Sequence, residues 1–246
     1  MVVLNISLIG FSQFISYQPK LMGGVFNYNL ILKQEFYCPQ DAISAKAQGE
    51  IKVDFLVDAN GLPSDFVIIN SVYPSVDTAY INVLRHCLWE AGTHDGVKSA
   101  MRIKMSEKYK LKKYQKIIKK RGYNQPEYPF KPYNPSLEIK ETHQLTSKAK
   151  TFYKSEAVNI YQFIAEYIKV PEAALKQGLK GIVELDFVVE ASGRLSNFKE
   201  VKGVGGGCTE EAIRLMQLMD WEPGKIGEEY VRSWYSIKVN FGNTRY

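Results

Sequence analysis

Residues 182–201, which read IVELDFVVEASGRLSNFKEV, predict a β-hairpin. The first eight positions are mostly β-branched, aromatic or leucine, the composition typical of a buried strand. Ala191-Ser192-Gly193 interrupts this run before a second one near 195–201, and Gly193 stands where a tight turn favours a positive φ. This region therefore indicates two antiparallel strands joined by a short turn.

A similar hairpin pattern occurs 132 residues earlier, at residues 50–69 (EIKVDFLVDANGLPSDFVII). Sliding the chain by 132 positions without a gap, from Pro39 to Gly92, gives fifteen identities. Average composition would give about three. We therefore predict that the chain contains two copies of one domain.

Helical patterns flank each hairpin. Residues 25–36 precede the first hairpin and residues 158–168 precede the second, while 209–219 has apolar residues at helical spacing after the second hairpin. An alternating strand pattern then closes each copy, at 235–241 clearly and at 101–105 more weakly. Each copy is thus predicted to run helix, strand, strand, helix, strand.

The positive charge is concentrated between the two copies. The chain has 32 Lys and Arg against 26 Asp and Glu, a net charge of +6. Residues 106–150 alone carry +8, which leaves −2 for the rest. A basic character confined to one segment argues against a nucleic-acid-binding fold.

That middle segment has two parts. Residues 106–121 predict a basic helix with one apolar face, and Gly122 is a plausible stop. Prolines then recur every third residue within 126–135, which is typical of an extended polyproline II spacer. Two interpretations stay open: a solvated spacer that separates the domains, or a contact with an anionic surface, a glycan or a peptide.

The amino-terminal residues 2–11 (VVLNISLIGF) are apolar enough for the core of a secretion signal. Gly10 and Ser12 supply small residues for cleavage before Gln13, although a basic start is missing. We expect residues 1–12 to be the remnant of a signal peptide, and the alternative is a first buried strand. The first interpretation implies export.

No catalytic or metal-binding pattern occurs. The three cysteines are widely spaced and the three histidines lack zinc spacing, so we expect the cysteines to pack in the core and predict no metal. Residues 203–207 (GVGGG) precede a helix, but Cys208 occupies the third position of the dinucleotide motif and no Walker lysine follows. We interpret this run as a flexible loop and expect neither a cofactor nor enzyme activity.

Each copy carries a series of short motifs. The second copy has Val170-Pro171-Glu172-Ala173-Ala174, Gly178-Leu179-Lys180-Gly181, the segment 187–193, Glu210-Glu211-Ala212 and Trp221-Glu222-Pro223-Gly224; the first has Met22-Gly23-Gly24, Cys38-Pro39-Gln40-Asp41-Ala42 and Asp58-Ala59-Asn60-Gly61. In this order and spacing they resemble the TonB C-terminal domain in its Bacteroidetes form, twice over. The resemblance covers most of residues 17–105 and 150–243.

This resemblance implies an α+β fold in which each copy packs a three-stranded antiparallel sheet on two helices. It suggests units at 17–105, the more divergent copy, and 150–246, with a basic, proline-rich linker at 106–149. It also implies a periplasmic protein of the Gram-negative envelope. Family members pull on outer-membrane transporters and bind a short receptor peptide as an added strand.

The partner expected from the resemblance is a TonB-dependent receptor or another envelope protein, bound along the last strand of each sheet, near 231–241 and 100–105. The residues expected to face this partner are Val231, Arg232, Trp234, Ser236, Lys238, Asn240, Arg102 and Lys104.

The chain departs from the energy-transducing members in two ways. No stretch is long and apolar enough for a membrane helix, and the proline-rich spacer lies between the copies. We therefore expect that the chain does not itself transmit force from an inner-membrane motor. The alternative function is a structural scaffold of an envelope complex, with sheet edges covered by each other or by a second copy in a homodimer.

Overall fold

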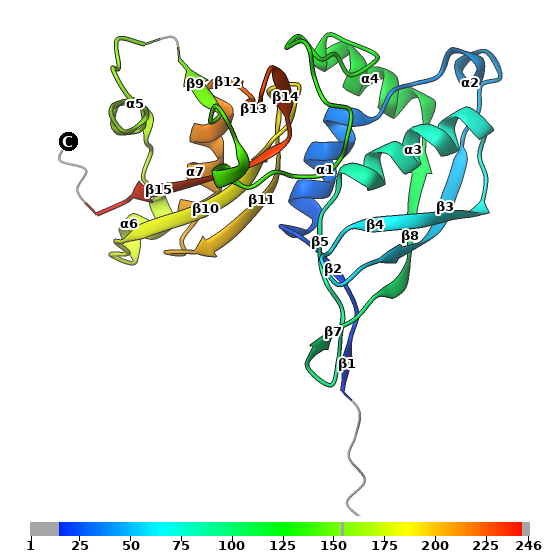
Figure 1. Ribbon diagram of the computed structural model, residues 1–246, viewed down its shortest axis with the longest axis horizontal. Helices are drawn as coiled ribbons and strands as arrows, with labels where there is room; N and C mark the ends of the chain where they lie inside the picture. Colours follow the sequence, from blue (N-terminus) through cyan, green and yellow to red (C-terminus); the bar gives the residue numbers. More distant parts are fainter. Residues whose placement is uncertain (1–14, 154, 243–246) are drawn as a thin grey trace, which may run out of the picture.

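The computed structural model describes residues 15–153 and 155–242. The segment 1–12, where a signal remnant is expected, lies outside the described residues. Two α+β units stand side by side, the first drawn in blue to green and the second in yellow to red (Figure 1). The predicted fold class, two small units of antiparallel sheet and helices, is confirmed.

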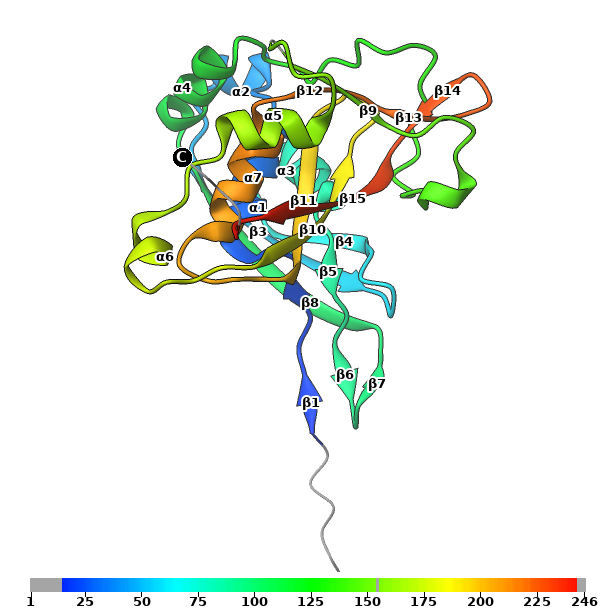
Figure 2. The same cartoon turned by 90° about the vertical axis from the view of Figure 1, so that its left-hand side faces the viewer.

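The first unit contains an antiparallel sheet of order β4-β3-β8. Its strands are β3 (Gly49–Val57), β4 (Pro63–Asn70) and β8 (Met101–Tyr109), and its helices are α1 (Gly24–Glu35), α2 (Gln40–Ser44) and α3 (Pro74–His86). Short strands complete the unit: β1 (Ser16–Tyr17), β2 (Lys20–Leu21), β5 (Trp89–Glu90), β6 (Thr93–His94) and β7 (Val97–Lys98). The β6–β7 hairpin, together with β1, projects away from the body of the unit (Figures 1 and 2).

The second unit repeats this plan with sheet order β11-β10-β15. Its strands are β10 (Ile182–Val189), β11 (Leu195–Lys202) and β15 (Ser233–Asn240), and its helices are α5 (Ile160–Tyr167), α6 (Glu172–Lys176) and α7 (Cys208–Gln217). The short strands here are β9 (Lys150–Phe152), β12 (Asp220–Glu222), β13 (Gly224–Ile226) and β14 (Glu229–Val231).

The duplication extends to the strand register. Val57 pairs with Met101 in the first sheet and Val189 pairs with Ser233 in the second, a constant offset of 132 residues. The register shifts between β3 and β4 recur between β10 and β11 at the same offset. Asp65 and Asn197, again 132 apart, both adopt a positive φ near 50°. The repeat in the sequence therefore corresponds to a repeat of backbone geometry.

Each unit has its own apolar core around an aromatic pair. Phe55 packs edge-on against Trp89 in the first unit, and Phe187 packs likewise against Trp221 in the second. The four side chains are buried. Since burial of large apolar side chains is the main favourable term in folding, each copy contains the elements of an independent core.

The segment between the units is packed rather than free. It begins with helix α4 (Leu111–Arg121), whose Tyr114 is buried against Phe36 with ring centroids 4.1 Å apart. Further along, the main chain of Asn134 donates to Tyr230 O at 2.9 Å. A short 3₁₀ turn, Thr142–Gln144, then lies beside β15. The linker thus packs on both units instead of holding them apart as a solvated spacer, which is one of the two interpretations that the sequence leaves open.

Candidate peptide-binding edges

One edge of the second sheet, formed by β11, is covered by the first unit. Asn27 Nδ2 donates to Phe198 O at 2.7 Å, and Phe198 N donates to Asn27 Oδ1 at 3.0 Å. Nearby, Asn197 Nδ2 donates to His86 O at 2.9 Å while its Oδ1 accepts from Leu88 N at 2.8 Å. Both amides are fully buried. The Asn27 amide therefore occupies main-chain positions of β11 that an added strand would need, and the Asn197 side chain of β11 fixes the same edge to the main chain of the first unit.

The other edge of this sheet, β15, is half covered by the linker. Trp234 N donates to Lys140 O at 3.0 Å, and Lys140 N donates to Arg232 O at 2.9 Å. The Trp234 N–H consequently points away from β10. Because strand groups alternate with a period of two, the N–H groups of Ser236, Lys238 and Asn240 point the same way.

The side chains expected to face a partner on this edge divide into two groups. Val231 and Arg232 are buried, and Arg232 Nε lies 2.6 Å from Glu190 Oε2. Trp234 is half-buried, whereas Ser236, Lys238 and Asn240 are exposed. Only the second half of β15 therefore presents accessible side chains and main-chain groups together.

Ser236 and Lys238 also have partners on the neighbouring strand. Ser236 Oγ donates to Asp186 Oδ1 at 2.6 Å, and Lys238 Nζ lies 3.2 Å from Glu184 Oε1. These cross-strand pairs lie on the solvent-exposed face of the sheet, so they leave the outward main-chain groups of β15 accessible.

The corresponding edge strand of the first sheet is β8, whose side chains are exposed or half-buried up to Lys108. Its nine residues pair with β3, from Gly49 opposite Tyr109 to Val57 opposite Met101. Within the described residues no other strand pairs with it. By the 132-residue correspondence with β15, the N–H groups of Arg102, Lys104, Ser106 and Lys108 point away from β3.

The two expected residues of this edge differ in their surroundings. Arg102 contacts Asp54 and Asp65, and its Nη2 donates to Asp65 O at 3.0 Å. These contacts raise the pKa of Arg102, with the hydrogen bond to Asp54 the largest cause. Lys104 is exposed. Arg102 thus ties β8 to the hairpin, while Lys104 remains available to a partner.

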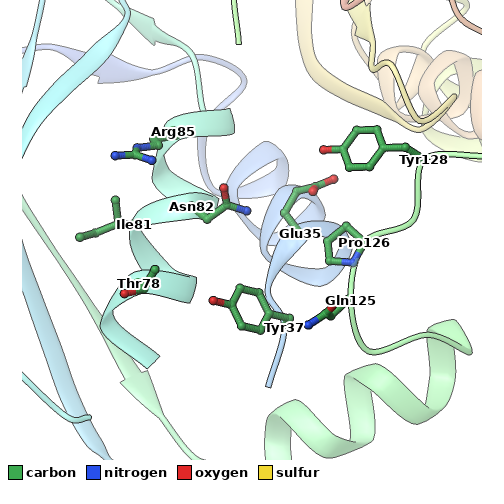
Figure 3. Close-up of a pocket in the computed structure, with 9 residues that line it drawn as sticks. All are labelled: Glu35, Tyr37, Thr78, Ile81, Asn82, Arg85, Gln125, Pro126 and Tyr128. Carbon is green, nitrogen blue, oxygen red and sulfur yellow. The ribbon is translucent and has the colours of Figure 1, made fainter. Parts of the chain in front are cut away.

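A cavity of about 560 Å³ lies beside α1 and α3. Figure 3 shows Tyr37 and Tyr128 directed into it, with Glu35 between the helices and the linker. Glu35 Oε1 accepts from Arg194 Nε and Nη2 at 3.1 and 3.0 Å. Burial, with a contribution from Glu35, raises the pKa of Tyr128 to about 12. Most of the residues that line this cavity are polar, and the one carboxylate among them, Glu35, is bound to Arg194.

The three cysteines occupy core positions, as expected from the sequence. Cys38, Cys87 and Cys208 are free and buried. Burial raises the pKa of all three thiols, that of Cys87 to about 12. Such thiols stay protonated at neutral pH and are poor nucleophiles. Among the described residues no cluster could hold a metal ion.

The glycine run has a steric explanation. Gly205, Gly206 and Gly207 all have positive φ, and Gly207 precedes the first turn of α7. A Cβ on Gly206 would lie 2.9 Å from the main chain of Ala174. Glycine is therefore required for the close approach of this loop to α6.

Comparison with known families gives a match to both units. The model of the Gram-negative bacterial TonB protein C-terminal region matches residues 34–111 and 166–242, more than half of the chain. The chain belongs to the TonB C-terminal family. The predicted resemblance, including its occurrence in two tandem copies, is confirmed.

Among solved structures, the chain is similar to the TonB C-terminal domain of Helicobacter pylori, residues 179–285, determined by NMR in solution. The identity is 14%, the TM-score is 0.27, and the match covers 35% of this chain and 79% of that one. No curated protein matches the chain. The family assignment therefore rests on the two matched segments.

Membership gives a general function for these two units. TonB C-terminal domains are periplasmic, non-enzymatic protein-interaction domains that act with outer-membrane receptors. In the described part of this chain, the helices are too short or too polar to cross a bilayer. The coarse prediction of a TonB-like interaction protein thus agrees with the family.

The sequence did not predict which edges the chain covers itself. Asn27, Asn197 and Lys140 make those contacts, and none belongs to a periodic apolar pattern. One signal was present in the repeat: the first copy has Asp65 where the second has Asn197. An amide can both donate and accept hydrogen bonds, whereas a carboxylate can only accept them. The amide at position 197 is therefore the residue suited to a buried edge, and it belongs to the second copy, whose β11 edge is covered.

Proposed function

We propose that this protein captures an extended segment of an outer-membrane transporter or another envelope protein by strand addition, chiefly along β8 of the first TonB C-terminal unit. The observation that carries the proposal is the nine-residue edge of β8, paired on one side alone within the described residues. An added strand would satisfy the outward N–H and C=O groups of that edge.

The two sheets offer unequal docking lengths. In the second unit, Lys140 already bonds to the main chain of Arg232 and Trp234, which leaves the stretch from Ser236 to Asn240. In the first unit no such contact blocks the outward main-chain groups of β8 within the described residues, and its side chains are exposed or half-buried from Met101 to Lys108. Since each main-chain hydrogen bond contributes about 1 kcal/mol, a longer edge favours β8.

Side chains on both faces of β8 would give selectivity. Met101, Ile103 and Met105 are half-buried on the helix-covered face, while Lys104 and Lys108 are exposed on the other. A matching peptide would alternate apolar residues with polar or acidic ones. Such capture would couple the chain to TonB-dependent transport through whichever partner supplies the force.

The test compares proline substitutions at equivalent positions of the two edges. Lys104→Pro and Ser236→Pro each remove one outward N–H and spare the bonds to the central strand, and both residues are exposed. Each variant and the native protein are used to capture outer-membrane receptors from envelope extract. A synthetic peptide of the captured receptor's periplasmic segment then serves in hydrogen exchange.

The expected result is that Lys104→Pro loses the receptor while Ser236→Pro retains it, with both variants folded by circular dichroism. Peptide binding should also slow amide exchange at Arg102, Lys104 and Ser106. If only Ser236→Pro lost the receptor, the binding site would be assigned to β15 instead of β8. Capture of the receptor by both variants would overturn the proposal of strand addition.

A scaffold function is the second candidate, and one observation favours it for the second unit. The β11 edge is already bonded to Asn27 of the first unit. Self-covering of this kind leaves no site for an external strand on β11. If neither edge captures a receptor, the protein would be assigned to this structural class.

A further inference from the structure

Helix α4 has two chemically distinct faces. At 3.6 residues per turn, Lys112, Lys116 and Lys119 fall within about 60° of one another. Lys120 and Lys113 extend the same face. The opposite face carries the buried Tyr114, with Leu111, Ile117 and Ile118 half-buried against the first unit. The apolar face therefore belongs to the core, and the lysine face points to solvent.

The lysines of this face are largely without counterions. Lys113 forms an ion pair with Glu107, at 2.7 Å between Nζ and Oε1. Among the described residues, Lys112, Lys116, Lys119 and Lys120 have no carboxylate within ion-pair distance. Those four charges lie within about 12 Å along the helix axis, and each lies within about 6 Å of the next along that axis, less than the Debye length of about 8 Å at physiological salt. They act together as one positive surface.

The helix is held firmly to its unit. Arg121, at its last turn, donates to the carbonyl oxygens of Lys33, Gln34 and Phe36 at the end of α1, at 2.7, 3.1 and 2.6 Å. Cations near a helix C-terminus complement its dipole. The lysine surface is thus fixed in orientation, whereas lysines on a free spacer would not be.

We propose that the lysine face of α4, defined as Lys112, Lys116, Lys119 and Lys120, docks electrostatically on an anionic lipid bilayer. Lysines act as hydrated point charges suited to a diffuse layer of headgroups. Clusters of four or more basic residues on one helix face are typical of binding to anionic lipids. No aromatic side chain is interleaved on this face, so base stacking of single-stranded nucleic acid has no platform.

The position of the face gives the docking a geometric consequence. One residue, Lys110, separates the end of β8 from the start of α4. The helix lies at the end of the first unit opposite the β6–β7 hairpin (Figures 1 and 2). Docking would hold the first unit at the bilayer with its hairpin directed away from the lipid. The proposal stands independently of whether β8 binds a peptide.

The test uses the full chain in sedimentation with two kinds of vesicle: phosphatidylglycerol with phosphatidylcholine at one to two, and phosphatidylcholine alone. One variant combines Lys112→Gln, Lys116→Gln, Lys119→Gln and Lys120→Gln. A matched control combines Lys148→Gln, Lys169→Gln, Lys180→Gln and Lys202→Gln, four exposed lysines of the remainder of the chain. Both variants remove the same net charge.

The native chain should bind the anionic vesicles, with an affinity that falls as the salt concentration is raised. It should not bind the neutral vesicles. Since each lysine near an anionic surface contributes about fivefold in affinity, the α4 variant, which lacks four of them, should bind on the order of several hundredfold more weakly. The control variant should retain most of the affinity.

Three outcomes would overturn the proposal. Equal weakening in both variants would show a general effect of net charge. Equal binding to neutral vesicles would show that charge is not the cause. Binding to polyglutamate but not to anionic vesicles would indicate an acidic polypeptide as the partner. Circular dichroism of both variants excludes unfolding as the reason for a loss.

Discussion

Asn27 and Phe198 lie 171 residues apart and join the two units by a reciprocal pair of hydrogen bonds, at 2.7 and 3.0 Å. The Asn27 amide uses its N–H and its oxygen on the main chain of β11, as a neighbouring strand would. Gly23 stands close by with φ 63°, and a Cβ there would collide with Asn27 and with Phe198 O. The first unit thus covers an edge of the second with one side chain.

Replacing Asn27 by Asp should test how much this contact contributes to the stability of the protein. The carboxylate keeps the size of the side chain but loses the donor, which leaves Phe198 O unpaired beside a buried charge. We expect the free energy of unfolding to fall by about 1–3 kcal/mol or more. Urea unfolding measures it. Asn60→Asp, at an exposed turn, serves as the control and should stay within about 0.5 kcal/mol of the native value.

The buried ion pair between Glu190 and Arg232 should be costly to break from one side. Both side chains are at most 5% exposed. Glu190→Gln leaves the guanidinium without its counterion, so we expect a loss of about 3–5 kcal/mol at pH 7. Glu172→Gln removes an exposed pair with Lys176 and should cost less than about 1 kcal/mol. Equal effects in the two variants would argue against a desolvated pair.

The same carboxyl predicts a pH dependence. Burial by itself raises the pKa of Glu190, but Arg232, His86 and hydrogen bonds outweigh burial, so the pKa lies below its usual value. Its contribution to stability is therefore present above the unfolded pKa of about 4.3 and is lost as pH falls through the folded pKa. Unfolding titrations of native protein between pH 7 and 3 should show this acid loss, and Glu190→Gln should show less of it.

The glycine loop should respond to steric change. Gly206→Ala places a Cβ 2.9 Å from Ala174 at a φ of 61°, whereas Gly178 has a similar φ of 63° and nothing within 4 Å. Both alanine variants carry the cost of a positive φ, about 1 kcal/mol. We expect Gly206→Ala to lower the melting temperature by several degrees more than Gly178→Ala. Identical shifts would contradict the packing explanation.

The thiols should be unreactive in the folded protein. Burial raises the pKa of Cys87 to about 12, and a raised folded pKa means that stability is full below the unfolded thiol pKa and declines as pH rises toward 12. Labelling with a disulfide reagent at pH 8 should be slow for all three cysteines and fast after urea is added. Rapid labelling of one thiol in the native state would contradict its burial.

The hairpins, the repeat and the family could be predicted from residues near one another in the chain. Alternating apolar positions in 51–57 and 182–189 specify strands, and Gly61 and Gly193 supply the turns. The repeat at a fixed offset of 132 residues can be detected in the sequence alone. Of the candidate site, the sequence therefore located the last strands, although not their accessibility.

The sequence by itself determined that two TonB C-terminal units exist, because each unit is built from local periodicity and turn residues. Only the tertiary structure decided that they differ. Asn27 covers β11 and the linker half covers β15, whereas β8 has no second neighbouring strand among the described residues, and α4 packs on the first unit. These features depend on Asn27, Lys140 and Tyr114 meeting partners from 78 to 171 residues away. The apolar face that includes Tyr114 indicates from the sequence that α4 packs, but which partner each of these residues meets is set by how the finished units pack.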